Sequence, residues 1–202
     1  MQLQLPKATY FLIGINSTVF IFFNIIYGVP VCGDPPWMLV CMNSNSLFLL
    51  AQVNQLVLSG ERTYQLISST FAHISFLHLL WNMIGLLYFG SKLEKISNSP
   101  TVLTTFLFAG FAAGVSTLTL GPLVSLGASG ALFGIVGAYS VLGPVKDRRK
   151  VMTSILLFLF LIHLPFLLGA NINFLSHLTG FLTGAFVGVV AKRLRTNKLI
   201  DC

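Results

Sequence analysis

The chain has 202 residues, of which 55% are hydrophobic and only 8% are charged, and its formal net charge is +7. An average soluble domain has roughly 25% charged residues, so this composition excludes a soluble fold with an ordinary polar surface. The positive charge does not indicate nucleic-acid binding, because the basic residues stand in short runs between long apolar segments, as in membrane-protein loops. We therefore expect an all-α membrane protein that is embedded in the lipid bilayer and has no nucleic-acid partner.

Six segments approach or reach the roughly 20 apolar residues that a membrane-spanning helix requires. They are residues 8–28, 73–90, 101–120, 125–143, 151–169 and 173–191. Segment 37–60 is also apolar, but asparagine, serine and glutamine interrupt it, so we expect short amphipathic helices at the outer interface there. Residues 1–202 are predicted to form one six-span membrane domain without an internal repeat.

The positions of lysine and arginine test this topology, because both accumulate in cytoplasmic loops. With six spans and an inside N-terminus, eleven basic residues fall on the cytoplasmic side: Lys7, Lys92, Lys95, Lys146, Arg148, Arg149, Lys150, Lys192, Arg193, Arg195 and Lys198. Only Arg62 falls outside. A seventh span at 37–60 would put the loop of Lys92 and Lys95 opposite Lys7, so six spans with both termini in the cytoplasm is the preferred topology.

The three cysteines, Cys32, Cys41 and Cys202, have no spacing typical of a metal site. We therefore expect no bound metal. Cys32 and Cys41 fall in one predicted external loop, where a disulfide is one interpretation and two free, partly buried thiols are the favoured one.

Polar side chains inside a membrane are energetically unfavourable and mark functional sites. Three predicted spans contain them in their first turns, namely His73, His78 and Asn82 in the second, Ser129 in the fourth, and Ser176 and His177 in the sixth. All three spans run from outside to inside. With a helical rise of about 1.5 Å per residue, Ser129 lies roughly 6 Å past Ser125 and His177 roughly 6 Å past Asn173. The two residues are predicted to share one depth in the membrane.

Glycines accompany both residues on their helices, and small residues at this spacing let membrane helices approach closely. Gly130 and Gly134 lie beside Ser129, while His177 shares a stripe with Gly180, Gly184 and Gly188. A serine hydroxyl becomes a nucleophile when a neighbouring imidazole takes its proton. We therefore expect Ser129 and His177 to form a hydrogen-bonded pair between two packed helices.

Attack by a serine creates an oxyanion, which suitably placed hydrogen-bond donors stabilise. Candidate donors are the backbone N–H of Ser129 at a helix N-terminus and the side chains of His78 and Asn82. No acidic residue lies within a predicted span, so the expected arrangement is a Ser-His dyad and not a Ser-His-Asp triad.

Four motifs follow one another over roughly residues 60 to 190. They are His73-Ile-Ser-Phe-Leu-His78-Leu-Leu-Trp-Asn82, Gly90-Ser-Lys-Leu-Glu94, Gly127-Ala-Ser-Gly130 and His177-Leu-Thr-Gly180. In order and spacing they resemble the rhomboid family of intramembrane serine proteases. The resemblance implies a six-transmembrane-helix rhomboid core in which residues 31–72 form the family's interfacial first loop.

The same resemblance implies roles for individual residues. Ser129, flanked by the motif glycines Gly127 and Gly130, would be the nucleophile, and His177 the general base and later the acid. His78 and Asn82 would stabilise the oxyanion. The implied substrates are single-span membrane proteins cleaved near their outer membrane boundary, with no metal or organic cofactor.

The chain departs from the family pattern at two positions. Gln65 stands where the family commonly has an arginine in the first loop, which puts the anchoring of that loop in question more than catalysis. Phe133 stands one turn after the nucleophile, where some relatives have a tyrosine that packs on the catalytic imidazole. Ring stacking would survive this change, while any role of the hydroxyl would be lost.

A non-proteolytic rhomboid-like protein that binds membrane helices is the alternative function. A channel or carrier is disfavoured, because the predicted spans lack carboxylates and repeated broken helices. We interpret His73 and His163 as structural, His73 by fixing the first loop against the second span. We expect a monomer or weak oligomer, and the family analogy favours a prokaryotic cell membrane.

Overall fold

The computed structural model describes residues 5–27, 41–144, 149, 152–153, 157 and 173–200. Its helices are α1 Lys7–Tyr27, α2 Ser44–Leu50, α3 Asn54–Leu58, α4 Gln65–Ser68, η2 Ser69–Phe71, α5 Phe76–Gly85, η3 Leu86–Gly90, α6 Ser91–Ile96, α7 Ser99–Leu120, α8 Ser129–Leu142 and α10 Phe174–Ile200. Two short strands, β1 Gln52–Val53 and β2 Val124–Ser125, pair in antiparallel register. The predicted fifth span at 151–169, with His163, lies outside the described residues apart from three isolated positions.

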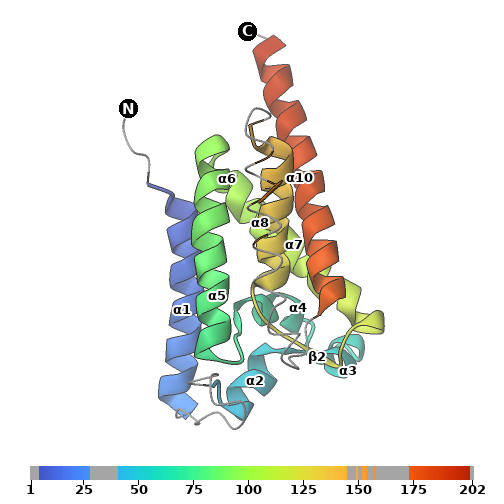
Figure 1. The fold of residues 1–202 in the computed structure, drawn as a ribbon. Helices are drawn as coiled ribbons and strands as arrows, with labels where there is room; N and C mark the ends of the chain where they lie inside the picture. Colours follow the sequence, from blue (N-terminus) through green and yellow to red (C-terminus); the bar gives the residue numbers. More distant parts are fainter. Residues whose placement is uncertain are drawn as a thin grey trace.

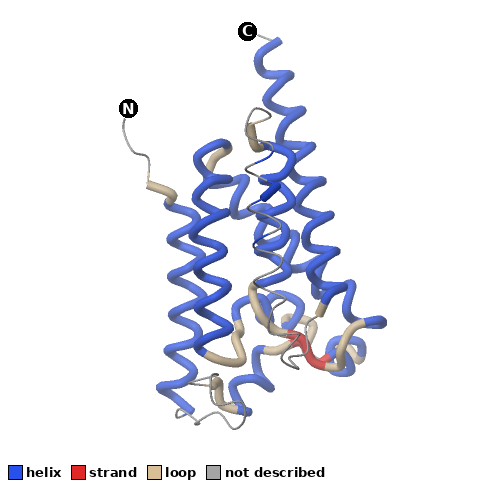
Figure 2. Tube along the Cα trace, in the orientation of Figure 1, coloured by secondary structure: helices blue, strands red, loops and turns tan. Residues whose placement is uncertain are grey.

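The long helices run in two directions (Figure 1). Helices α5, α8 and α10 start at the end of the molecule where the short helices α2, α3 and α4 gather, whereas α1 and α7 run the opposite way. The start of α1 and the end of α10 therefore lie at the same end of the bundle, and the strand pair lies at the other (Figure 2). We call residues 41–75, at the strand end, the loop layer.

Three helices in the described part are each long and apolar enough to cross a membrane: Lys7–Tyr27, Ser99–Leu120 and Phe174–Thr196. Their outward faces carry large exposed apolar side chains, such as Ile25 on α1, Phe108 on α7 and Phe186 on α10. Apolar surface of this extent is expected to face lipid. The described residues thus form a mostly helical membrane protein, while the count of six spans stays a prediction.

The predicted second span is one continuous helical run in the structure, residues 76–96, which includes the π-helical turn η3. It begins three residues later than predicted because Ala72 is extended and Ser75 caps the helix, its Oγ accepting from the N–H of His78 at 3.2 Å. The run passes the predicted end at residue 90 through α6.

The predicted fourth span, 125–143, starts too early. Ser125 belongs to β2, where it pairs with Gln52 of β1, and the helix begins only at Ser129. Between them Gly127 has a φ of +116°, a backbone conformation that other residues rarely adopt. Ser129 is therefore the first residue of its helix, and the four residues before it form the end of β2 and a turn.

Glycines allow α8 and α10 to pack backbone against backbone. A Cβ at Gly180 would overlap the carbonyl oxygen of Gly130, one at Gly184 that of Gly134, and one at Gly137 that of Phe181. Gly130, Gly134, Gly137, Gly180 and Gly184 therefore form what we call the α8–α10 seam. Any larger side chain along the seam would force the two helices apart.

The loop layer is held to the bundle by buried amide side chains. The Nε2 group of Gln52 donates to the carbonyl of Gly114 on α7 at 2.9 Å, and Asn54 Nδ2 donates to that of Thr117 at 2.7 Å. Gln65 accepts from the N–H of Val53 at 3.0 Å and donates to the carbonyl of Phe48 at 2.9 Å. Gln65, which stands in place of the expected arginine, thus joins two parts of the loop layer to each other, while Gln52 and Asn54 anchor the layer to α7.

Arg62 supplements this anchor from the surface. Its guanidinium donates to the carbonyl of Phe48 at 2.9 Å and lies 4.2 Å from the centroid of the Phe48 ring. The same carbonyl therefore accepts from both Gln65 and Arg62, so a cation within the loop layer, three residues before Gln65, shares its acceptor with the amide.

Cys41 is disulfide-bonded, so its interpretation as a free thiol is wrong. Cys32 and Cys202 lie outside the described residues. Next to Cys41, the N–H of Met42 donates to the carbonyl of Ile74 at 2.9 Å, and Cys41 forms an isolated bridge with Ser75. This pairing joins the start of the loop layer to the residues that lead into α5.

Glu94 on α6 links three helices at the opposite end of the bundle. Its carboxylate accepts from the backbone N–H groups of Ala8 and Thr9 in the first turn of α1, at 2.9 and 3.0 Å, and from Ser99 Oγ at 2.6 Å. A carboxylate at a helix N-terminus satisfies N–H groups that lack a partner within the helix. Glu94 thereby fixes α1 against the start of α7.

Candidate active site

Ser129 and His177 meet at the end of the seam that lies nearest the loop layer. The Ser129 Oγ and His177 Nε2 atoms are 2.8 Å apart, which is hydrogen-bonding distance. For the serine to donate to Nε2, the imidazole must carry its proton on Nδ1. His177 is 5% exposed, so the pair is largely shielded by the protein.

Phe133 holds the imidazole from one face. Its ring is stacked on that of His177 with a centroid distance of 4.3 Å and an interplanar angle of 11°. Phe133 follows Ser129 by one turn of α8, so the helix that carries the serine also orients the histidine. This is the ring packing predicted for the position, without a hydroxyl.

The turn before Ser129 is fixed by backbone N–H groups. Gly127 donates to the carbonyl of Ser69 at 2.9 Å, and Ala128 donates to His73 Nε2 at 3.4 Å. His73 thus fixes the turn that leads to Ser129, a structural role more specific than the predicted contact between loop and second span. The N–H of Ser129 itself, at the first position of α8, has no partner within its helix.

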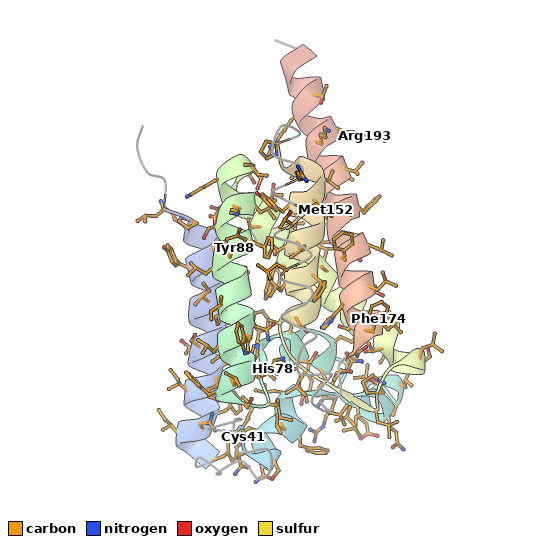
Figure 3. All side chains as sticks on the ribbon, in the orientation of Figure 1. Cys41, His78, Tyr88, Met152, Phe174 and Arg193 are labelled. Carbon is orange, nitrogen blue, oxygen red and sulfur yellow. The ribbon has the colours of Figure 1, made fainter. Side chains whose placement is uncertain are left out.

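His78 lies against this turn from α5, near the start of the helix (Figure 3). A Cβ at Gly127 would lie 2.9 Å from His78 Nε2 and 2.6 Å from Cε1. The missing side chain of Gly127 therefore makes room for the imidazole two residues before the serine. The His73 ring meets that of His78 edge-on, with centroids 5.1 Å apart.

Asn82 lies one turn further along α5 and is buried. Its Nδ2 donates to the carbonyl of His78 at 2.8 Å, and its Oδ1 has no hydrogen-bond partner within the described residues. No hydrogen bond in that part of the chain joins Asn82 to Ser129. The structure thus brings Ser129, His177 and Phe133 into contact, places His78 against Gly127, and leaves Asn82 bound to its own helix.

Two contributors to the site were not singled out by sequence reasoning. The carbonyl of Ser69 has no side-chain signature, so nothing in the sequence points to it. Asn173 accepts from the N–H of Ser176 through Oδ1 at 3.1 Å and donates through Nδ2 to Ser125 Oγ at 3.2 Å. Asparagine immediately before an apolar periodic segment is a helix-start signal, and that signal marks Asn173.

The chain is similar to known proteins, both as a family and as individual relatives. The Rhomboid domain family matches residues 60–194. RHOMBOID-like protein 5 of Arabidopsis thaliana is 36% identical over 145 residues, 67% of this chain and 46% of that protein. Rhomboid protease GluP of Bacillus subtilis is 28% identical over 185 residues, 90% of this chain and 34% of that protein.

A third relative is RHOMBOID-like protein 6, mitochondrial, of Arabidopsis thaliana. It is 30% identical over 139 residues, which are 66% of this chain and 45% of that protein. The chain spans less than half the length of these three relatives. They come from a plant and a bacterium, so they do not support the prediction of a prokaryotic membrane. With its family match over residues 60–194 and its apolar helices, this chain is an integral membrane protein and belongs to the rhomboid family.

Proposed function

We propose that this protein is a serine endopeptidase that cleaves transmembrane proteins within the membrane by a Ser-His dyad. The observation that carries the proposal is the 2.8 Å separation between Ser129 Oγ and His177 Nε2, at the start of a helix in a rhomboid family member. A serine that only fills space in a glycine-rich helix does not require an imidazole at hydrogen-bonding distance. A serine nucleophile does require one, because a neighbouring base has to take its proton.

In the proposed reaction, Ser129 Oγ attacks the carbonyl carbon of the scissile peptide bond while His177 Nε2 takes the hydroxyl proton. The resulting oxyanion accepts from the N–H of Ser129 and from a ring N–H of His78, which lies beside Gly127. Collapse breaks the C–N bond, and His177 returns the proton to the leaving amine. Water, deprotonated by His177, then attacks the acyl carbon, and as the ester bond breaks His177 returns the proton to Ser129 Oγ.

Asn82 has a supporting role in this scheme. Its Nδ2 already bonds the carbonyl of His78, so its remaining N–H is the group available to an oxyanion. It also fixes the backbone of His78, the donor one turn before it. Both roles predict that Asn82 contributes to the rate without being indispensable.

The proposed substrates are single-span membrane proteins, cleaved near their outer membrane boundary. The polar pair lies at the loop-layer end of the bundle, and the disulfide at Cys41 supports placing that end outside, since disulfides persist in oxidising compartments. The basic residues at the opposite end, such as Lys92 and Lys192, support cytoplasmic termini. We propose a monomer or weak oligomer in a cell membrane, acting without a metal or organic cofactor.

Cleavage by purified protein tests the proposal. Parent protein reconstituted into vesicles with a single-span substrate should cleave it, and Ser129→Ala and His177→Ala should lose most of that activity. Asn82→Ala should retain some, because loss of one oxyanion donor typically reduces the rate about 10²-fold to 10³-fold. Ser140→Ala, on the same helix as Ser129, is the matched control. Cleavage by Ser129→Ala at the parent rate would refute the proposal.

The alternative, a non-proteolytic binder of membrane helices, predicts a different result. Such a protein would capture the single-span substrate without cleaving it, and replacement of Ser129 would leave capture unchanged. The contact between Ser129 and His177 favours the protease, because a binder has no use for an activated serine.

A further inference from the structure

We propose that Asn173 and Ser125 form a positioning pair that sets the distance between the serine and the imidazole; this inference rests on the proposed function. Asn173 Nδ2 donates to Ser125 Oγ at 3.2 Å. Neither residue belongs to the dyad, and among the described residues neither forms a side-chain hydrogen bond with Ser129 or His177. Their effect on the reaction is exerted through His177 and Ser129.

The pair links the two segments that carry the dyad. Ser125 precedes Ser129 by four residues, and Asn173 precedes His177 by four. The Asn173–Ser125 bond and the Ser129–His177 bond therefore join the same two segments at equivalent positions, one just before the helices start and one within their first turns. Two hydrogen bonds at successive positions fix both the separation and the relative rotation of these segments, whereas a single hydrogen bond would leave the rotation free.

Asn173 is coupled directly to the helix turn that bears the imidazole. Its Oδ1 accepts from the N–H of Ser176 at 3.1 Å, and its backbone carbonyl accepts from the N–H of His177 at 3.3 Å. An asparagine in this position satisfies N–H groups at the helix start that otherwise lack partners. A movement of Asn173 therefore changes the position of the first turn of α10, including His177.

Ser125 is held from the other side by the loop layer. It pairs with Gln52 in the two-stranded sheet. Next to the sheet, the N–H of Asn54, the residue after β1, donates to the carbonyl of Leu123, the residue before β2, at 3.0 Å. Gln52 is fully buried and bonds α7. The strand pair, which Gln52 fixes to α7, is thereby connected through Ser125 and Asn173 to the helix turn that carries His177.

The seam does not make this pair redundant. Its glycine contacts begin at Gly130 and Gly180 and continue away from the loop layer, so they fix the helices beyond the dyad. On the other side of the dyad, the side chains of Ser125 and Asn173 connect the two segments. Ser176 also packs against Gly130 beside the dyad, but among the described residues the Asn173–Ser125 bond is the side-chain hydrogen bond that joins the two segments ahead of the dyad.

The test compares four variants by two rates. Ser125→Ala removes only the bond between the pair, Ser125→Thr keeps a hydroxyl in the strand, Asn173→Ser keeps the helix cap but is too short to reach Ser125, and Asn173→Ala removes both functions. The labelling rate of Ser129 by a small fluorophosphonate probe and the kcat and KM for a reconstituted single-span substrate are measured for each. Thermal unfolding in detergent is recorded in parallel, with Ser116→Ala on α7 as the control.

Loss of one neutral hydrogen bond corresponds to about a threefold to tenfold change, so Ser125→Ala and Asn173→Ser should slow labelling and lower kcat by that factor. KM and the unfolding temperature should stay near the parent values, and Ser125→Thr should restore the rates. Asn173→Ala should be slower than either. A merely structural pair would change the unfolding temperature and spare the labelling rate of the folded protein.

The inference is overturned if Ser125→Ala and Asn173→Ser label and cleave at the parent rate, or if Ser125→Thr is as slow as Ser125→Ala. Those outcomes leave the proposed function intact, since the parent still cleaves. A parent protein that neither labels nor cleaves would instead overturn the proposed function itself.

Discussion

The α8–α10 seam and the loop layer both support the candidate site, but by different physical means. Along the seam, a Cβ at Gly180 or Gly184 would overlap a backbone carbonyl of α8, so the packing leaves no space for an added atom. In the loop layer, Gln65 and Asn54 hold the chain by hydrogen bonds between neutral groups. Close packing has few alternative arrangements, whereas neutral hydrogen bonds can break and reform.

This difference suits the two tasks of the proposed intramembrane protease. The serine and imidazole have to keep a fixed geometry, and a helix pair packed through glycines supplies it. A substrate helix has to reach that geometry, which requires another part of the molecule to move. We expect the loop layer to move, together with the predicted fifth span near His163 and Pro165, which lies outside the described residues.

The largest effect should come from filling the seam. Gly184→Val places a side chain where the Gly134 carbonyl lies, so α8 and α10 must separate and the dyad must lengthen. A misplacement of about 1 Å at a reacting centre reduces the rate roughly 100-fold, and we expect at least that loss of cleavage. Gly14→Ala is the control, because a Cβ at Gly14 meets nothing within 4 Å. Parent-like cleavage by Gly184→Val would show that the seam does not set the dyad.

Removing the amide anchor of the loop layer should affect stability more than chemistry. Gln65→Leu leaves the N–H of Val53 and the carbonyl of Phe48 with fewer partners, and each buried group left unsatisfied costs about 1–3 kcal/mol. The free energy of unfolding should fall by that order in detergent, while fluorophosphonate labelling of the folded protein stays near the parent rate. Ser59→Ala, at an exposed loop position, is the control. Equal losses in labelling and stability would contradict the division of roles.

A smaller, pH-dependent effect is expected at Glu94, at the end of the bundle opposite the loop layer (Figure 1). Partial burial acts to raise the pKa of Glu94, but hydrogen bonds from Ser99, Ala8 and Thr9 outweigh it and lower the pKa below its ordinary value. The carboxylate therefore stabilises the fold fully above its ordinary pKa, and this contribution is lost as the pH falls through the lowered value.

Comparison of the parent with Glu94→Gln measures this contribution. Hydrogen bonds to a charged group are worth about 1.5–3 kcal/mol, and solvent exposure reduces that here, so we expect the variant to be less stable at neutral pH by roughly 1–2 kcal/mol. The difference in unfolding temperature should shrink on acidification. A difference that does not depend on pH would contradict the assignment.

The smallest effect should come from the ring that packs on the imidazole. Phe133→Leu keeps apolar bulk but loses the stacked contact with His177, and aromatic pairs of this kind contribute about 0.5–1.5 kcal/mol. Labelling of Ser129 should slow by about twofold to tenfold, and Phe133→Tyr should label at the parent rate. If Phe133→Leu also labels at the parent rate, ring packing has no part in orienting His177.

The proximity of Ser129 and His177 could be predicted from the sequence, because both follow polar residues at helix starts and both lie on glycine stripes. Asn173 and Ser125, the two residues from which their depth was estimated, are bonded to each other in the structure. The helical geometry assumed for 125–129 was wrong, since strand pairing with β1 and the positive φ of Gly127 delay the helix. A strand of two residues produces no periodicity that a sequence could reveal.

The anchoring of the loop layer could not be predicted for a different reason. Gln65 replaces an expected arginine, and the sequence does not tell whether an amide reaches the same backbone groups. That depends on where α2 ends and α4 begins, which tertiary packing decides. The contact of His78 with Gly127 was likewise beyond sequence reasoning, since it joins two helices that are adjacent only in the fold.

Labelling of Ser129 by a fluorophosphonate probe tests most directly whether the dyad is an activated nucleophile. We expect the parent to be labelled at Ser129, and His177→Ala, which leaves the serine in place without its base, to be labelled far more slowly. Labelling of His177→Ala at the parent rate, or labelling of the parent at a serine other than Ser129, would contradict the account.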